Sequence, residues 1–306
     1  MEEDIWKKIN DFCLPWVDPN DENYWSNSMS TPVSCLYEEF QRLTIIECKK
    51  MLSDIENEIS KNPLSRKIRK YLYVSFVTKM ASLRLVHSNI SGCEVLIALR
   101  VKDFFEQAKV KGDFPSLTSD DGCVPLLIFV GKFLPLLTYH AEVNGISRSI
   151  FTRMSWLGRL NFFKYVVFRM KGFYPVIEYH MPKTTNKKFT KELLFDDYLV
   201  TSEIFKRNQN LKGTFQTNWY IDPQLKEITP HLGELGMLAS EYGALVICLG
   251  EDVKVIEDST RKSATRLKLY KDGLYKPKRY ARFWSRKDIM EFSKNYKPIN
   301  IDLLLN

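Results

Sequence analysis

Apolar residues recur at three- and four-residue spacing through most of the first half of the chain, which is the period of an amphipathic helix. The pattern predicts helices over residues 36–60, 64–87 and 94–111. Asn62 and Pro63 mark the turn between the first two of them. The N-terminal half is therefore expected to be a helical assembly.

The longest apolar run, residues 124–139, is too short for a membrane span. It contains 16 residues and is interrupted by Pro125, Lys132 and Pro135, whereas a bilayer needs roughly 20 apolar residues. Residues 118–120 offer side chains that can cap a helix just before it. We therefore expect a buried helix with a kink.

Residues 146–170 are expected to form one further helix, in which cations alternate with aromatic and aliphatic side chains. A basic amphipathic helix of this kind can lie on an anionic membrane. It can equally pack its aromatic face on the core and leave its cations in water. The cations are Arg148, Arg153, Arg159, Lys164 and Arg169.

After Gly172 the pattern changes to strands that alternate with helices, which is typical of helices covering a sheet. The sequence thus predicts an α+β chain, with a helix-rich N-terminal domain over 1–145 and an α/β domain with a mixed sheet over 146–306. The expected strands are 174–181, 213–221, 244–249 and 278–284, and the expected helices are 191–207, 229–242 and 260–271.

Positive charge is concentrated between Ser259 and Lys287, where eleven lysines and arginines accompany one acid, Asp272. This segment carries +10, and since the whole chain carries +8, the other residues sum to −2. Five aromatic side chains lie among the cations. The segment should face an anion, either the phosphates of a nucleic acid or those of a small carrier such as coenzyme A.

The N-terminus lacks the basic and apolar regions of a signal peptide, so a cytoplasmic location is expected, with peripheral membrane contact as an option through the 146–170 helix. No GxSxG, HExxH, Walker A or dinucleotide fingerprint occurs. The four histidines are far apart in sequence, so no metal site is expected.

Two polar pairs stand out at strand ends. Glu178 and His180 are two residues apart on an expected strand, so they face the same side, and a His beside a carboxylate can act as general base. Trp219 and Asp222 lie at the end of another expected strand, where ligands commonly bind in open sheets. The plainer interpretation of Glu178 and His180 is an edge strand whose polar residues face outward. The plainer interpretation of Asp222 is a turn residue before Pro223.

His231 is a third candidate. It follows Pro230 at the start of an expected helix, and helix N-termini attract anions. His231 would then contact a phosphate or a substrate. The alternative is an ordinary residue in the first turn of a surface helix.

The order of elements from Gly213 to Trp284 resembles the second half of the GNAT acyltransferase fold. The sequence YIDPQ at Tyr220–Gln224 is similar to the end of the strand that leads into the pyrophosphate turn, and SATRLKLY before Gly273 resembles a later helix of the family. The resemblance implies an acyl-CoA or acyl-carrier-protein donor whose thiol end lies between two splayed strands beside Tyr220. Glu227 and Thr229 stand where the family has small residues.

The resemblance also implies roles for individual residues. Tyr270 would protonate the departing thiolate, and Tyr220 and Gln224 would belong to the donor site. Glu178 or His180 would take a proton from an amine or hydroxyl acceptor, and no metal would be needed. The donor's phosphates would contact Arg261, Lys262, Arg266 and Lys268.

Three functions are thus compatible with the sequence. The first is an acyltransferase acting on an amine or a hydroxyl, with a small-molecule or carrier-protein donor. The second is a nucleic-acid-binding protein that uses residues 259–287. The third is a non-catalytic partner-binding protein, which the helical half and its acidic start favour: the first 60 residues contain 13 acids and 5 bases.

Overall fold

The structure is a computed structural model that describes residues 2–27, 29, 31–83, 90, 93–181 and 190–297. The chain divides into two compact units. The N-terminal unit holds the described residues as far as His140, and the C-terminal unit holds Ala141–His180 and the described residues from 190 onward. The expected fold class is confirmed, because a helix-rich first part is followed by helices on a mixed sheet.

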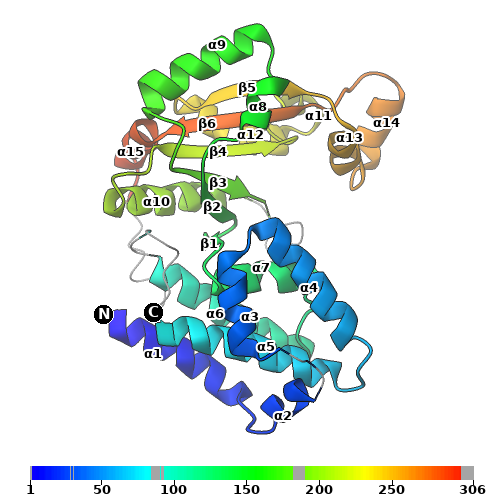
Figure 1. The fold of residues 1–306 in the computed structure, drawn as a ribbon. Helices are drawn as coiled ribbons and strands as arrows, with labels where there is room; N and C mark the ends of the chain where they lie inside the picture. Colours follow the sequence, from blue (N-terminus) through cyan, green and yellow to red (C-terminus); the bar gives the residue numbers. More distant parts are fainter. Residues whose placement is uncertain are drawn as a thin grey trace. The chain divides into compact units, whose positions relative to one another are not determined.

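The described N-terminal unit is built almost entirely of helices (Figure 1). Its core contains fully buried aromatic side chains from several helices, including Tyr37, Tyr73 and Phe76. The elements are α1 (Glu2–Cys13), the 3₁₀ turn η1 (Leu14–Trp16), α2 (Asp21–Ser26), α3 (Val33–Arg42), α4 (Ile45–Ile59), α5 (Ser65–Leu83), α6 (Glu94–Lys111), α7 (Asp120–Phe129) and the two-residue strand β1 (Leu134–Pro135).

The expected single helix over 36–60 is wrong, because α3 ends at Arg42 and α4 begins at Ile45. Thr44 caps α4: its hydroxyl accepts a hydrogen bond from the Glu47 amide, and the Glu47 carboxylate accepts one from the Thr44 amide. This reciprocal capping box satisfies the backbone amides of Thr44 and Glu47. In a continuous helix the same amides would donate to carbonyls four residues earlier. The apolar spacing on both sides concealed the break.

The apolar run at 124–139 is also divided. Ser119 caps α7 by accepting a hydrogen bond from the Gly122 amide, as expected for a helix start in 118–120. The helix ends at Phe129, however, and Gly131 follows with a φ of +74°. The rest of the run is therefore not helical.

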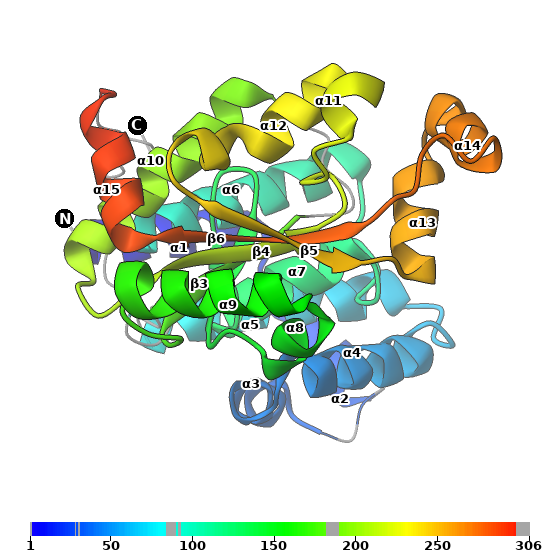
Figure 2. The same ribbon diagram turned by 90° about the horizontal axis from the view of Figure 1, so that it is seen from above.

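The C-terminal unit contains a sheet with the strand order β2-β3-β4-β6-β5 (Figures 1 and 2). β3 and β4 are parallel, whereas β4 with β6 and β6 with β5 are antiparallel. The elements are β2 (His140–Asn144), α8 (Arg148–Arg153), α9 (Trp156–Lys164), the π-helical turn η2 (Tyr165–Met170), β3 (Val176–His180), α10 (Lys191–Arg207), β4 (Gly213–Asn218), α11 (Leu225–Ile228), α12 (Pro230–Glu241), β5 (Leu245–Gly250), α13 (Val253–Thr260), α14 (Ala264–Lys271), β6 (Arg279–Ser285) and α15 (Arg286–Lys294).

The segment 146–170 is not the single helix that its periodicity predicts. Ser155 caps α9 through a hydrogen bond from the Gly158 amide, which separates α9 from α8. Tyr165–Met170 then continues as a π-helical turn. The buried side chains Phe162, Val166 and Met170 face the sheet and pack in one cluster with side chains of β3, β4, β5 and β6.

The opposite face of the sheet is covered by α10 and α12 (Figure 2). The buried Arg282 of β6 donates one hydrogen bond to Gln216 Oε1 at 2.7 Å and another to the carbonyl of Gly236 in α12 at 3.3 Å. Its guanidinium also lies 5.6 Å from the ring centre of Tyr198 in α10. Arg282 thus ties two strands to both covering helices.

Two glycines let α12 approach the loop after β4 closely. A Cβ atom at Gly236 would lie 2.0 Å from the carbonyl oxygen of Tyr220, and one at Gly233 would lie 2.4 Å from the amide nitrogen of Lys226. Neither distance is possible for a real side chain, and both contacts are with backbone. The close packing of α12 therefore depends on both glycines.

Candidate functional site

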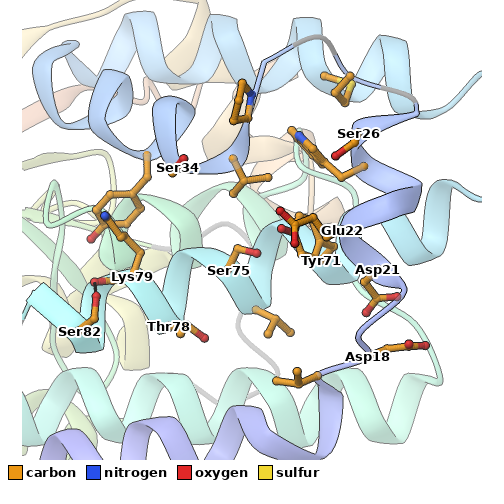
Figure 3. Close-up of a pocket in the computed structure, with 17 residues that line it drawn as sticks. Asp18, Asp21, Glu22, Ser26, Ser34, Tyr71, Ser75, Thr78, Lys79 and Ser82 are labelled. Atoms are coloured by element: carbon orange, nitrogen blue, oxygen red, sulfur yellow. Dashed lines mark hydrogen bonds between the residues drawn. The ribbon is translucent and has the colours of Figure 1, made fainter.

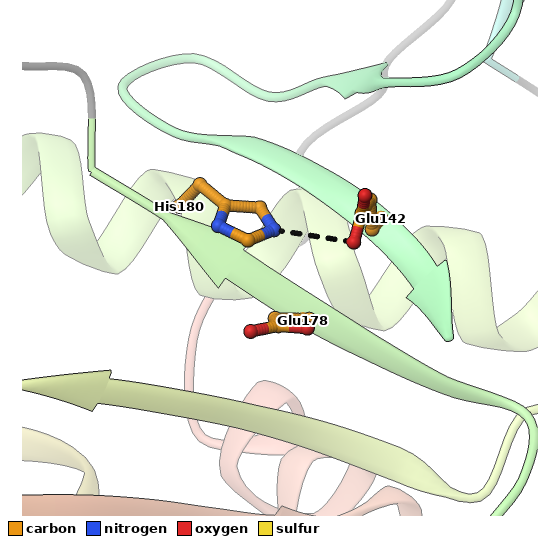
Figure 4. A group of neighbouring side chains, drawn as sticks. All are labelled: Glu142, Glu178 and His180. Carbon is orange, nitrogen blue, oxygen red and sulfur yellow. Dashed lines mark ion pairs between the residues drawn. The ribbon is translucent and has the colours of Figure 1, made fainter. Parts of the chain in front are cut away.

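Three titratable side chains meet on β2 and β3 (Figure 4). Glu178 and His180 continue the row of Val176 along one face of β3, and Glu142 comes from the neighbouring strand β2. His180 Nε2 lies 3.6 Å from Glu142 Oε2. All three side chains are partly buried, and the Nε2 atom of His180 is buried.

The environment of Glu178 favours its neutral form. Burial raises the pKa of this carboxyl above its usual value near 4.5, and the neighbouring Glu142 charge raises it further. His180 and a hydrogen bond from Asn144 act in the opposite direction without cancelling the shift. A carboxylate with a raised pKa is a stronger base than an ordinary surface glutamate.

The cluster borders the place where the two parallel strands separate. β3 pairs with β4 at Ile177 with Thr214 and at Glu178 with Phe215. Figure 4 shows the ribbons of β3 and β4 separating towards their C-terminal ends, with Glu178 and His180 on β3. The cluster thus lies where the two parallel strands separate, and the pKa of its Glu178 carboxyl is raised.

Two carboxylates and an imidazole are also suitable ligands for a divalent cation. Their candidate ligand atoms lie within 4.8 Å of one another. Glu142 Oε2 already accepts a hydrogen bond from Asn144 and lies near His180. The group is therefore chemically suited to acid–base chemistry and to cation binding alike.

A second group of expected site residues lies in the loop after β4. Tyr220 is buried and donates its hydroxyl to Gln216 Oε1 at 2.9 Å. Asp222 is fully buried, and its Oδ1 accepts a hydrogen bond from the Gln224 amide. Burial raises the pKa of Asp222. These contacts shape the loop, whereas Gln224 itself is exposed.

The cations expected to bind phosphate do not share one environment. Arg266 is buried, donates to the Ser259 carbonyl at 2.6 Å and lies 4.9 Å from the ring centre of Trp219. It therefore holds α14 against α13 and the loop after β4. The exposed cations of the set are Arg261, Lys262 and Lys268, and His231 at the start of α12 is exposed as well.

Tyr270 is on α14, with 37% of its surface exposed. Figures 1 and 2 place α13 and α14 beyond the ends of β5 and β6, away from β3. The structure thus brings Glu178 and His180 together but does not bring Tyr270 to them. The diverging pair also involves β3, which precedes the segment 213–284 on which the family resemblance rests.

The basic segment 259–287 is folded into the end of α13, α14, β6 and the start of α15. Its aromatic side chains Tyr275, Phe283 and Trp284 are buried, so they are not available to stack on unpaired bases. Arg279 lies 3.1 Å from Asp252. The charge remains, but the surface expected for a single-stranded nucleic acid is not formed by these rings.

Glu142 was missed by the sequence reasoning. The alternation in His140–Asn144 is short and follows the apolar run at 124–139, whose pattern suggested a helix. Only the pairing of β2 with β3 brings Glu142 to the cluster. The signal that could have found it is the acid's position in a second short strand with polar residues on one face.

The N-terminal unit contains a separate pocket of about 670 Å³ between α2, α3 and α5 (Figure 3). Asp18, Asp21 and Glu22 lie at one end and Lys79 at the other. Asp21 is paired with Lys70 at 2.6 Å. The residues that line this pocket include neither His nor Cys. Its described lining therefore lacks a group of carboxylates and histidine like the one on β2 and β3.

The sequence matches no protein-family model and no curated protein. A solved structure described as an acyltransferase in complex with decanoyl-CoA is similar to this chain, with a TM-score of 0.44 and 12% sequence identity. The match covers 73% of this chain and 67% of that one. At this level of similarity it identifies no activity. In the described part of the chain, no helix has the length and apolar character of a membrane span.

Proposed function

We propose that the chain is an acyltransferase that moves an acyl group from a thioester, acyl-CoA or an acyl-carrier protein, to an amine or hydroxyl acceptor. The observation that carries the proposal is the cluster of Glu142, Glu178 and His180 beside the parallel strands β3 and β4, whose ribbons separate towards their C-terminal ends (Figure 4). A gap between parallel strands exposes backbone groups that an extended ligand can pair with. The acyl donor would enter this gap.

In the proposed reaction Glu178 acts as the general base. Its carboxylate takes the proton from the acceptor while the acceptor's nitrogen or oxygen attacks the thioester carbonyl. The carbon–sulfur bond then breaks, and the donor leaves as a thiolate that takes a proton from solvent. His180, which lies beside Glu142, would relay the proton from Glu178 to solvent. The partial burial of Glu178 supports this role because it raises the carboxylate's basicity.

The direct test is donor binding followed by turnover. We expect CoA and acyl-CoA to raise the melting temperature, and free thiol to appear when acyl-CoA and an amine are supplied together. An acyl-carrier protein would be tried as the alternative donor. No stabilisation by any of these donors, together with no thiol release across a panel of amines and alcohols, would contradict the proposal.

The position of Tyr270 leads to a second expectation. Because α14 lies away from β3, Tyr270→Phe should keep its rate of thiol release within about twofold of the wild type, which is far less than the 10²-fold or greater loss expected for a catalytic acid. The measurement is kcat at saturating donor. A loss of that size in a folded variant would restore the general-acid role that the family resemblance implies for Tyr270.

A further inference from the structure

The outer surface of α8, α9 and η2 is apolar even though the inner surface of the same helices already packs on the sheet. Trp156 and Phe168 are each 75% exposed and Leu157 is 70% exposed. Other large apolar side chains of this segment that reach the surface are Phe151, Leu160, Phe163 and Val167. Single exposed apolar residues are ordinary, but a group of seven within 18 residues marks an interaction surface.

The same segment is strongly basic. Between Ile146 and Ile177 the sequence contains six cations and no acidic residue. Two of the six are neutralised by distant acids: Arg153 lies 2.7 Å from Asp252, and Arg169 lies 2.7 Å from Asp288. Arg159 instead donates hydrogen bonds to backbone carbonyls within the segment. Arg148, Lys164 and Lys171 therefore add positive charge to the apolar surface.

A basic pocket of about 500 Å³ continues this surface at the end of η2. Phe168 and Met290 contribute apolar walls, and five cations line the pocket. The side chain of Lys212 lies against Gly172, with its Cε 3.9 Å from the position of a Cβ there. Arg169 is one of the five and is paired with Asp288; the others are Lys171, Lys212, Arg286 and Lys287.

We propose that this surface, formed by α8, α9, η2 and the basic pocket, docks the protein on an anionic phospholipid bilayer. Trp156, Leu157 and Phe168 would enter the boundary between headgroups and acyl chains, where Trp is favoured. The cations around them would face lipid phosphates, and the pocket beside Phe168 would hold one anionic headgroup. This docking is independent of the proposed acyl transfer.

The charge of the surface argues for lipid over a second copy of the chain. In a two-fold symmetric contact the same patch meets itself, so Arg148, Lys164 and Lys171 would oppose their own counterparts without an acid in the segment to pair with. An anionic membrane instead attracts each basic residue near its surface. A bilayer therefore satisfies both the apolar side chains and the cations.

The test is co-sedimentation with vesicles. We expect the full chain to pellet with vesicles of equal parts phosphatidylcholine and phosphatidylglycerol, to remain in solution with pure phosphatidylcholine, and to be released by high salt. The double variant Trp156→Ser, Phe168→Ser should bind at least about tenfold more weakly, because it removes the two most exposed aromatic anchors. Lys164→Glu with Lys171→Glu should weaken binding to the anionic vesicles.

The matched control is Leu274→Ser, which removes a side chain that is 72% exposed on the loop after α14, outside the proposed surface. It should bind vesicles like the wild type. All variants change exposed residues, so circular dichroism and melting temperature should be unaffected. Equal binding by the double variant and the wild type would overturn the proposal. So would a lack of vesicle binding combined with a concentration-dependent dimer that the double variant abolishes.

Discussion

Glu178→Gln is expected to lower kcat for acyl transfer by about 10²–10⁴-fold, the usual contribution of a positioned general base. Glutamine has nearly the same shape as glutamate but accepts no proton at neutral pH. The change should leave donor affinity nearly intact, because the lost group acts on the acceptor. The measurement is thiol release at saturating donor, with donor affinity determined separately by calorimetry.

The same variant has a distinctive effect on stability. Since burial raises the pKa of Glu178, the folded protein holds this proton more tightly than the unfolded chain does. The wild type therefore loses free energy of unfolding as pH rises from about 4.5 through the raised pKa. Glu178→Gln removes that loss, so its stability relative to the wild type should increase over this range.

Glu234→Gln, an exposed change on α12, is the matched control for both measurements. It should alter neither kcat nor the pH dependence of unfolding. If Glu178→Gln were as active as the wild type, Glu178 would not be the base. An inactive variant with an unaltered pH dependence of stability would instead contradict the raised pKa.

Arg282→Ala is expected to destabilise the C-terminal unit by about 2–4 kcal/mol. The change removes hydrogen bonds to Gln216 and to the Gly236 carbonyl, each worth about 1.5–3 kcal/mol for a charged donor, and leaves a cavity beside Tyr198. Relief from the cost of burying a charge offsets part of this loss. The measurement is the urea midpoint of unfolding, followed by tryptophan fluorescence.

Lys268→Ala provides the comparison, because Lys268 is an exposed cation of the same basic segment. Its effect on unfolding should stay within about 0.5 kcal/mol. Arg282→Lys keeps the charge but not the two-pronged donor geometry, so it should recover little stability. A midpoint for Arg282→Ala equal to that of Lys268→Ala would mean that the interactions of Arg282 contribute no net stability.

Hydrophobic periodicity predicted the elements best where one face is buried and both ends are marked. The helix over 94–111 has the expected bounds, and Lys191–Arg207 is likewise confirmed. Periodicity failed where a polar cap interrupts an apolar pattern that continues on both sides, as at Thr44 and Ser155. In such places a few side-chain hydrogen bonds decide the break, and the spacing of apolar residues does not report them.

The candidate site was only partly accessible from the sequence for a different reason. Strand alternation was enough to put Glu178 and His180 on one side, because it is a local property. Glu142 joins them through the pairing of two strands, which depends on the whole sheet. Burial of Arg266 and Tyr275 within a strongly basic segment was equally inaccessible, because charge counts do not distinguish a solvated lysine from an arginine bonded to buried carbonyls.

The glycines of α12 have a consequence for finding relatives of this chain. A side chain at Gly236 would collide with the Tyr220 carbonyl, and one at Gly233 with the Lys226 backbone, so substitutions at either position should be removed by selection wherever this packing is kept. Surface positions around them are free to diverge. Distant homologues should therefore be recognised by two glycines three residues apart, preceded by an Asp-Pro turn, even when little else of the sequence remains.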